Sequence, residues 1–247
     1  MEPMEPTWET ALGGGRTSHG APMRAAETDN ARAYVSLKQA VLSGGFKPGE
    51  AVTLRALTKR LAIGDTPVRE AVKRLISEGA FEGLPNRSAR VPRLERREIQ
   101  QILELRITLE SNAAALAAHN ITLHQIEQLR ALHTAMGAAV AAADSNAYGK
   151  YNMAFHFEIY RIADNKTLAT LIEALWLRMA PFMSRTHSLI TGDAGQAWQL
   201  ACGSHEALLA AMQARDAEAA RSAMRADLSA LSKIDGYWER IENRSLK

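Results

Sequence analysis

The sequence predicts a mainly α-helical protein: an N-terminal winged helix-turn-helix followed by an antiparallel all-α bundle of six or seven helices. Three short amphipathic helices and a β-hairpin pattern follow one another within residues 31–93, whereas residues 94–240 are rich in alanine, helical in periodicity and without a strand pattern. Positive charge is concentrated in residues 31–93, which carry 12 basic and 5 acidic side chains and a net charge of +7. Such a basic segment suits a polyanionic partner.

The overall composition is that of a soluble globular protein. Of its 247 residues, 47% are apolar and 23% are charged, which is sufficient for a buried core. The single Cys202 excludes a disulfide framework within one chain and favours a reducing, cytoplasmic setting. No apolar run reaches the roughly 18 residues of a membrane span, and the acidic start lacks the apolar segment of a signal peptide.

The elements of the N-terminal part follow from local patterns. Residues 1–30 lack periodicity and are expected to be a disordered extension. One helix is expected from Ala31, and a second covers TLRALTKRLAI, in which leucines recur every three or four residues. In TPVREAVKRLISEG, Thr66 would cap a third helix, Pro67 would occupy its first position and Gly79 would end it. AFEGL and ARVPRL indicate two strands joined by a tight turn.

The polar face of this third helix is a candidate DNA-reading surface. In a helix-turn-helix, the N-terminal end of the second helix enters the major groove. Arg69 lies there and is the best candidate for a bidentate contact with guanine. Further candidates for phosphate or base contacts are Arg55, Thr66, Lys73, and Arg87 and Arg90 on the wing. The alternative is a polar surface without DNA-binding activity, but helix, turn, helix and basic wing occurring in this order weigh against it.

Residues 31–93 resemble the N-terminal domain of the GntR superfamily of bacterial transcription regulators. The resemblance rests on AVLSGGFKPGE, LRALTKRLAI, TPVREAVKRLISEG and LPNRSARV, and it implies DNA contacts by Arg55 and Arg69. This chain has Asp65 where the family has an arginine and Ser88 where it has a wing-tip glycine. An aspartate at a helix N-terminus interacts favourably with the helix dipole and with nearby Arg69, and it can accept from cytosine. We therefore expect Asp65 to shift operator preference and to preserve binding.

The C-terminal part predicts a bundle in which a few polar side chains stand on apolar helices. Its helices are expected at about 95–118, 122–143, 145–163, 166–190, 194–213 and 215–240, with a tail at 241–247. Arg106 and Glu110 are one turn apart, as are Asn152 and His156, so each pair projects from one helix face.

Residues 95–235 resemble the FCD ligand-binding domain of the FadR subfamily. The matching patterns are RITLE at 106–110, NMAFH at 152–156 with Asn165 nine residues later, and His205 on a late helix. Many members hold a divalent metal, often zinc or nickel, with one aspartate and three histidines. The positions that match this ligand set are Asn152, His156, His205 and Asp227.

Two of these four positions depart from the family pattern: Asn152 replaces a carboxylate, and Asp227 replaces a histidine. Two histidines and an aspartate are still a credible set for Zn²⁺ or a similar ion, and Asn152 could be a weak ligand or a hydrogen-bond donor. The alternative is a metal-free polar pocket in which both histidines are buried and hydrogen-bonded.

The resemblance also implies that the effector is a small organic acid. Arg106 is the best partner for its carboxylate, because an unpaired guanidinium among apolar residues is costly, but a salt bridge to Glu110 would account for Arg106 equally well. Arg161 and Arg178 are further candidates for effector binding. The histidines outside the motifs are expected at the surface or between helices: His119, His124, His133 and His187.

These features predict a cytoplasmic, nucleoid-associated transcription regulator that binds a pseudo-palindromic operator as a homodimer. By family resemblance it is a repressor that releases DNA when the effector binds. One alternative is a nucleic-acid binder with a purely structural dimerisation bundle, which would not need the polar constellation at residues 152, 156, 205 and 227. Another is a metal-dependent enzyme, but the sequence contains no nucleophile or metalloprotease motif, so we expect no enzymatic activity.

Overall fold

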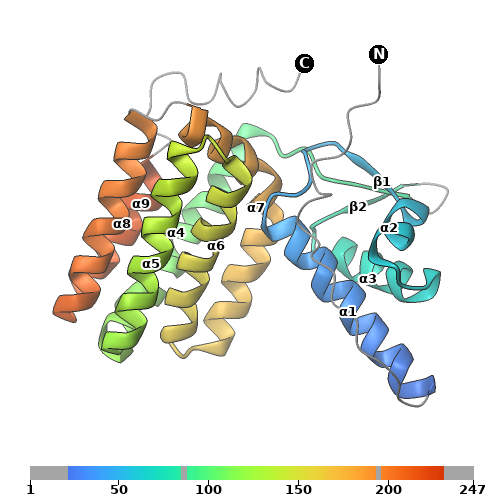
Figure 1. Ribbon diagram of the computed structural model, residues 1–247, viewed down its shortest axis with the longest axis horizontal. Coiled ribbons are helices and arrows are strands. Elements are labelled where there is room, and N and C mark those ends of the chain that lie inside the picture. Colours follow the sequence, from blue (N-terminus) through green and yellow to red (C-terminus); the bar gives the residue numbers. More distant parts are fainter. Residues whose placement is uncertain (1–21, 85–87, 193–195, 231–247) are drawn as a thin grey trace. The chain divides into compact units, whose positions relative to one another are not determined.

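The computed structural model describes residues 22–84, 88–192 and 196–230, and its elements confirm the predicted mainly α fold (Figure 1). The chain divides between Leu94 and Glu95 into two compact units, and the segment Trp176–Phe182 is grouped with the first. Within the described residues, no helix combines the length and the hydropathy that crossing a membrane requires.

The first unit is a winged helix-turn-helix. It contains α1 (Pro22–Leu42), β1 (Ala51–Thr53), α2 (Leu54–Leu61), α3 (Asp65–Ser77), β2 (Glu82–Leu84) and β3 (Ser88–Arg90). The strands form one antiparallel sheet in the order β1-β3-β2, in which Arg90 lies opposite both Ala51 and Glu82. The predicted hairpin is therefore present, and β1 is an additional strand. Helix α1 begins at Pro22, earlier than the predicted start at Ala31.

The start of α3 differs from the sequence prediction. Gly64 is the N-cap, with extended backbone angles (φ −60°, ψ 158°), and Thr66 already lies inside the helix. The predicted cap at Thr66 is therefore wrong. The carbonyl of Gly64 accepts the first helical bond, from the Val68 N–H at 3.3 Å. Pro67 is tolerated because the first-turn N–H groups of a helix have no internal acceptor.

The core of the first unit holds α3 in place. The apolar face of α3 is buried at Val68, Val72 and Leu75, and α3 packs against α1. Beyond its C-cap at Glu78, Gly79 has a positive φ of 76°, and the Gly79 and Ala80 N–H groups return to carbonyls of the last turn. A glycine at this position ends the helix without strain, as the sequence predicts.

The described part of the second unit contains six helices, close to the predicted ranges. They are α4 (Arg96–Asn120), α5 (Leu123–Ala141), α6 (Ser145–Ile162), α7 (Lys166–Gly192), α8 (Gln196–Ala214) and α9 (Ala217–Ala230). Helix α4 packs against α6, α8 and α9, and α5 packs against α6 and α8 (Figure 1). The predicted extension of the last helix to residue 240 lies outside the described residues.

A long-range polar contact secures the C-terminal end of α4. The guanidinium of Arg215 donates to the carbonyl oxygens of His119 at 2.7 Å and Ile121 at 2.6 Å. Carbonyl groups at a helix end lack intrahelical donors, so the contact satisfies them and ties the end of α8 to the end of α4.

We predict that Arg215→Ala destabilises the protein by about 1–2 kcal/mol, because two charge-assisted hydrogen bonds to backbone carbonyls are lost. Chemical denaturation would measure the change. Arg225→Ala, at an exposed position of α9, is the control and is expected to be nearly neutral. Equal stabilities of the two variants would contradict the capping role.

Candidate metal centre and DNA interface

Three of the four predicted metal ligands meet inside the second unit. They are His156 on α6, His205 on α8 and Asp227 on α9. Nε2 of His156 lies 3.4 Å from Oδ2 of Asp227, and Nε2 of His205 lies 3.4 Å from Oδ1 of the same carboxylate. All three sets of ligand atoms lie within 4.8 Å of one another. With metal–ligand bonds of about 2.0–2.1 Å, tetrahedral N and O ligands are about 3.3 Å apart, so the spacing suits one ion.

Burial favours the neutral forms of the two histidines and of the aspartate in this centre. It lowers the pKa of His156 well below the usual value and that of His205 to about 3. Burial, with a contribution from the charge of Glu110, raises the pKa of Asp227 to about 7. The 3.4 Å contacts of His156 and His205 with the Asp227 carboxyl group are therefore made by neutral imidazoles and are not ion pairs. Neutral imidazoles offer lone pairs to a metal, and a divalent cation would favour the ionised form of Asp227.

A chain of buried polar groups lies behind His156. Nε of Arg106 donates to Oε1 of Glu110 at 2.6 Å, and both side chains are almost fully buried. The hydroxyl of Tyr160 donates to Oε2 of Glu110, and its oxygen lies 3.3 Å from Nδ1 of His156. Because the hydroxyl hydrogen is given to Glu110, we infer that its oxygen accepts from Nδ1–H, which leaves the Nε2 lone pair toward Asp227. Metal-ligating histidines are usually fixed through their second nitrogen in this way.

The remaining predicted site residues lie in different environments. Asn152 is buried on α6, one turn before His156. Arg106 is paired with Glu110, the alternative that the sequence left open. Arg161 is exposed, and its Nε binds Glu158 of the same helix at 2.8 Å; Arg178 is exposed on α7. Neither arginine is among the residues whose ligand atoms converge, which are His156, His205 and Asp227, and effector binding by Arg161 and Arg178 stays a prediction.

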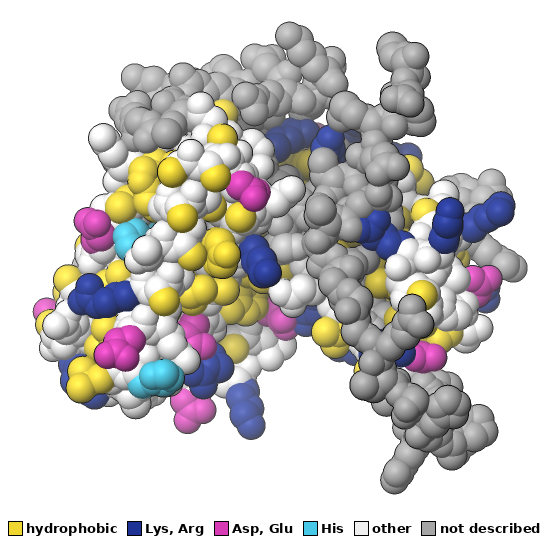
Figure 2. All heavy atoms as spheres, viewed as in Figure 1, with side chains coloured by type: hydrophobic (Ala, Val, Ile, Leu, Met, Phe, Trp, Pro, Cys, Tyr) yellow, Lys and Arg dark blue, Asp and Glu magenta, His cyan; other side chains and the backbone are white. Residues whose placement is uncertain are grey.

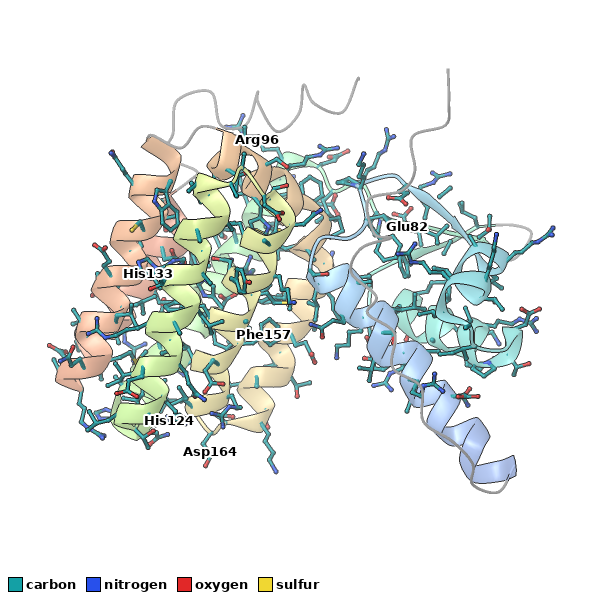
Figure 3. The ribbon with its side chains drawn as sticks, in the orientation of Figure 1. Glu82, Arg96, His124, His133, Phe157 and Asp164 are labelled. Atoms are coloured by element: carbon teal, nitrogen blue, oxygen red, sulfur yellow. The ribbon has the colours of Figure 1, made fainter. Side chains whose placement is uncertain are left out.

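Two residues near the centre were not identified from the sequence. Tyr160 lies four residues after His156, and this spacing, which places both on one helix face, could have indicated it. His187 on α7 is buried, its charge state acts on His156, and its Nε2 has no hydrogen-bond partner within the described residues. His119 and His124 are exposed, and His133 is half-buried on α5, where Figure 3 labels it.

In the first unit, two of the predicted DNA-binding residues, Arg55 of α2 and Arg69 of α3, line one concavity of about 620 Å³. It is lined by Thr53, Leu54, Arg55, Thr58, Lys59, Asp65 and Arg69. Nε of Arg69 and Oγ1 of Thr58 are buried and have no hydrogen-bond partner within the described residues. Unsatisfied donors in a basic concavity suit an anionic oxygen. Asp65 lies in the first turn of α3 as expected, but in the described part of the chain no ion pair joins it to Arg69.

The other predicted DNA contacts lie on the surface of the first unit. Thr66, Lys73 and Arg90 are exposed, and Lys73 pairs with Glu70 at 2.8 Å. Arg87 lies outside the described residues. Lys and Arg side chains are visible on the face of this unit in Figure 2. These exposed cations are free to meet a phosphate backbone, since surface pairs such as Lys73–Glu70 are weak.

A basic winged helix-turn-helix joined to a helical domain defines a DNA-binding transcription regulator. Residues 30–91 match the family described as "Bacterial regulatory proteins, gntR family", and residues 101–230 match the FCD domain. The chain therefore belongs to the GntR family and carries an FCD domain, as the resemblance implies. This is a family of transcription regulators, not of enzymes.

Individual relatives agree with this assignment. "HTH-type transcriptional regulator McbR" of Escherichia coli (strain K12) is 31% identical over 185 residues, which are 75% of this chain and 82% of the relative. A "Probable D-xylose utilization operon transcriptional repressor" of Paenarthrobacter nicotinovorans is 27% identical and covers 74% and 78%. The solved structure of E. coli McbR/YncC is similar with a TM-score of 0.71 and 27% identity, covering 88% of this chain and 95% of that one.

We predict that Glu110→Gln destabilises the protein by roughly 3–5 kcal/mol, because the buried guanidinium of Arg106 loses its compensating charge. Denaturant unfolding in the presence of a chelator would measure this loss. Glu104→Gln, at an exposed position of α4, is the matched control. The double variant Arg106→Met/Glu110→Leu should recover much of the stability, since no unpaired charge remains. A Glu110→Gln protein as stable as the control would refute the role of the pair.

Proposed function

We propose that this protein is a homodimeric repressor whose affinity for a pseudo-palindromic operator is controlled by a small organic acid bound at a metal centre in the FCD domain. The observation that carries the proposal is the convergence of His156, His205 and Asp227 on one buried point, with His156 held by Tyr160. The name of the Paenarthrobacter relative, a probable repressor, supports repression over activation.

In the DNA-binding step, the N-terminal end of α3 enters the major groove and Arg69 contacts a guanine edge. Arg55, beside it in the same concavity, binds the phosphate backbone together with Thr66 and Lys73. Arg87 and Arg90 extend the contact along the wing. Asp65 lies beside Arg55 and Arg69 and replaces a phosphate-binding arginine, so it acts on the choice of sequence more than on total affinity.

In the sensing step, His156, His205 and Asp227 hold a divalent metal, zinc or nickel. Nitrogen and carboxylate ligands suit either ion, and three protein ligands leave positions open for a carboxylate effector. Asn152, one turn before His156, is a fourth ligand or binds the effector by hydrogen bonds. Arg106 is engaged by Glu110, so it positions the network through that carboxylate. When bound, the metal supplies a positive charge that attracts an organic anion.

We predict that Arg69→Ala lowers affinity for the specific operator by about 1–3 kcal/mol and relaxes base preference at one position. Titration of operator and random duplexes at one fixed salt concentration would measure both effects. Arg32→Ala, an exposed arginine of α1 paired with Asp29, is the control. An equal loss on both duplexes would show that Arg69 binds only phosphates.

We also predict that Tyr160→Phe weakens metal binding about 10- to 100-fold, because His156 loses the group that orients it. His156→Ala should abolish binding at this centre, and both variants should still bind the operator without effector. Isothermal titration with Zn²⁺ and Ni²⁺ would measure metal binding, and a thermal-shift screen of small carboxylic acids with and without metal would identify the effector.

The control for these variants is Tyr151→Phe, on another face of α6. Normal operator release by effector in the His156→Ala variant would place the sensor elsewhere. Release by an acid in the complete absence of metal would favour the metal-free pocket. Full operator regulation without any stabilising acid would favour a structural bundle.

A further inference from the structure

A second cluster of metal-ligating side chains lies on α5 and α8, outside the centre described above. Its members are His133, Cys202 and Glu206. Sγ of Cys202 lies 3.7 Å from Nε2 of His133 and 3.6 Å from Oε1 of Glu206, and that Nε2 lies 4.0 Å from the same Oε1. One sulfur, one nitrogen and one oxygen thus form a nearly equilateral triangle.

We propose that this triangle is a second metal site, with Cys202, His133 and Glu206 as ligands for a borderline or soft divalent ion such as Zn²⁺. With bonds of about 2.3 Å to sulfur and about 2.0–2.1 Å to nitrogen and oxygen, tetrahedral ligands are separated by about 3.3–3.5 Å. The two edges at sulfur exceed these values by about 0.1–0.2 Å, and the nitrogen–oxygen edge exceeds them by about 0.7 Å, which a rotation of the exposed Glu206 side chain can close.

The local structure supports the site in two ways. Cys202 and Glu206 are one turn apart on α8, so they project from one face, and α5 packs against α8 to bring His133 opposite them. His133 is 15% exposed and Glu206 66% exposed, so an ion has access from solvent and can keep a water molecule as its fourth ligand. A thiolate, an imidazole and a carboxylate together favour zinc over magnesium or calcium.

Without an ion, the three side chains are joined by two weak sulfur contacts, from Sγ of Cys202 to Oε1 of Glu206 and to Nε2 of His133. Nδ1 of His133 is buried without a hydrogen-bond partner within the described residues. An ion bound at Nε2 selects the neutral tautomer whose proton lies on Nδ1. Metal binding replaces the thiol proton by the metal: Cys–SH and M²⁺ give a Cys–S–M⁺ bond and one released H⁺.

Cobalt(II) titration of the full chain tests the site, because a cobalt–thiolate bond gives a near-ultraviolet charge-transfer band. Cys202 is the only cysteine of the sequence, so such a band is assigned without ambiguity. We expect the band in the wild-type protein, its loss in Cys202→Ser, and at least a roughly tenfold weaker cobalt affinity in Glu206→Gln. Glu127→Gln, at an exposed position of α5, is the matched control and should bind cobalt normally.

Thiol reactivity gives a second readout, since bound Zn²⁺ should protect Cys202 from a disulfide reagent. Absence of the band, equal thiol reactivity with and without Zn²⁺, or an unchanged band in both His133→Gln and Glu206→Gln would overturn the proposal. His156→Ala separates this site from the buried centre, because it removes a ligand of that centre alone. The band should persist in His156→Ala whether or not the buried centre binds metal.

Discussion

The buried ion pair between Arg106 and Glu110 is the interaction on which the interior of the second unit depends. A charge inside a helical bundle is tolerated only when it is paired and hydrogen-bonded. The pair forms within α4, and Glu110 then accepts from Tyr160 of α6. The Tyr160 hydroxyl oxygen also contacts Nδ1 of His156, and Nε2 of His156 faces Asp227 on α9. The Arg106–Glu110 ion pair on α4 therefore acts through Tyr160 on the orientation of the His156 ring.

The same pair shapes the electrostatics of the centre. Burial is the main cause of the high pKa of Asp227; the charge of Glu110 raises it further and that of Arg106 lowers it. The centre therefore contains two neutral histidines and a carboxyl group that ionises with difficulty, an arrangement that favours a cation over an anion as its first occupant. The concavity of the first unit has the opposite character: Arg55, Lys59 and Arg69 line it, and Nε of Arg69 and Oγ1 of Thr58 have no hydrogen-bond partner in the part of the chain that the structure describes. The concavity therefore suits an anionic partner, whereas the buried centre suits a cation.

Helical periodicity is a local property and predicted most helices, whereas the three converging ligands were indicated by the resemblance to the FCD domain. It failed where long-range packing decides the outcome. Strand β1 has only three residues and exists because β3 pairs with it, and the α3 cap depends on the backbone of Gly64. The partner of Arg106 was left open between Glu110 and an effector, and the structure pairs Arg106 with Glu110 at 2.6 Å. The cluster around Cys202 could not be predicted, since His133 is 69 positions away and only the packing of α5 on α8 joins them.

The two candidate metal-binding clusters are adjacent, because His205 of the buried centre lies beside His133 of the second cluster. The ring of His205 lies 5.5 Å from that of His156 and 5.7 Å, edge to face, from that of His133, between centroids. His133 in turn stacks with Trp198 at 6.0 Å. An ion at either cluster orients one of these two adjacent rings. Any change in ion affinity that this causes at the other cluster is the same in both directions, because coupling between two binding sites is reciprocal. We therefore expect substitution of His205 to disturb both clusters, whereas His156 and Cys202 each belong to one cluster, and substitutions at these two positions separate the contributions of the clusters to sensing.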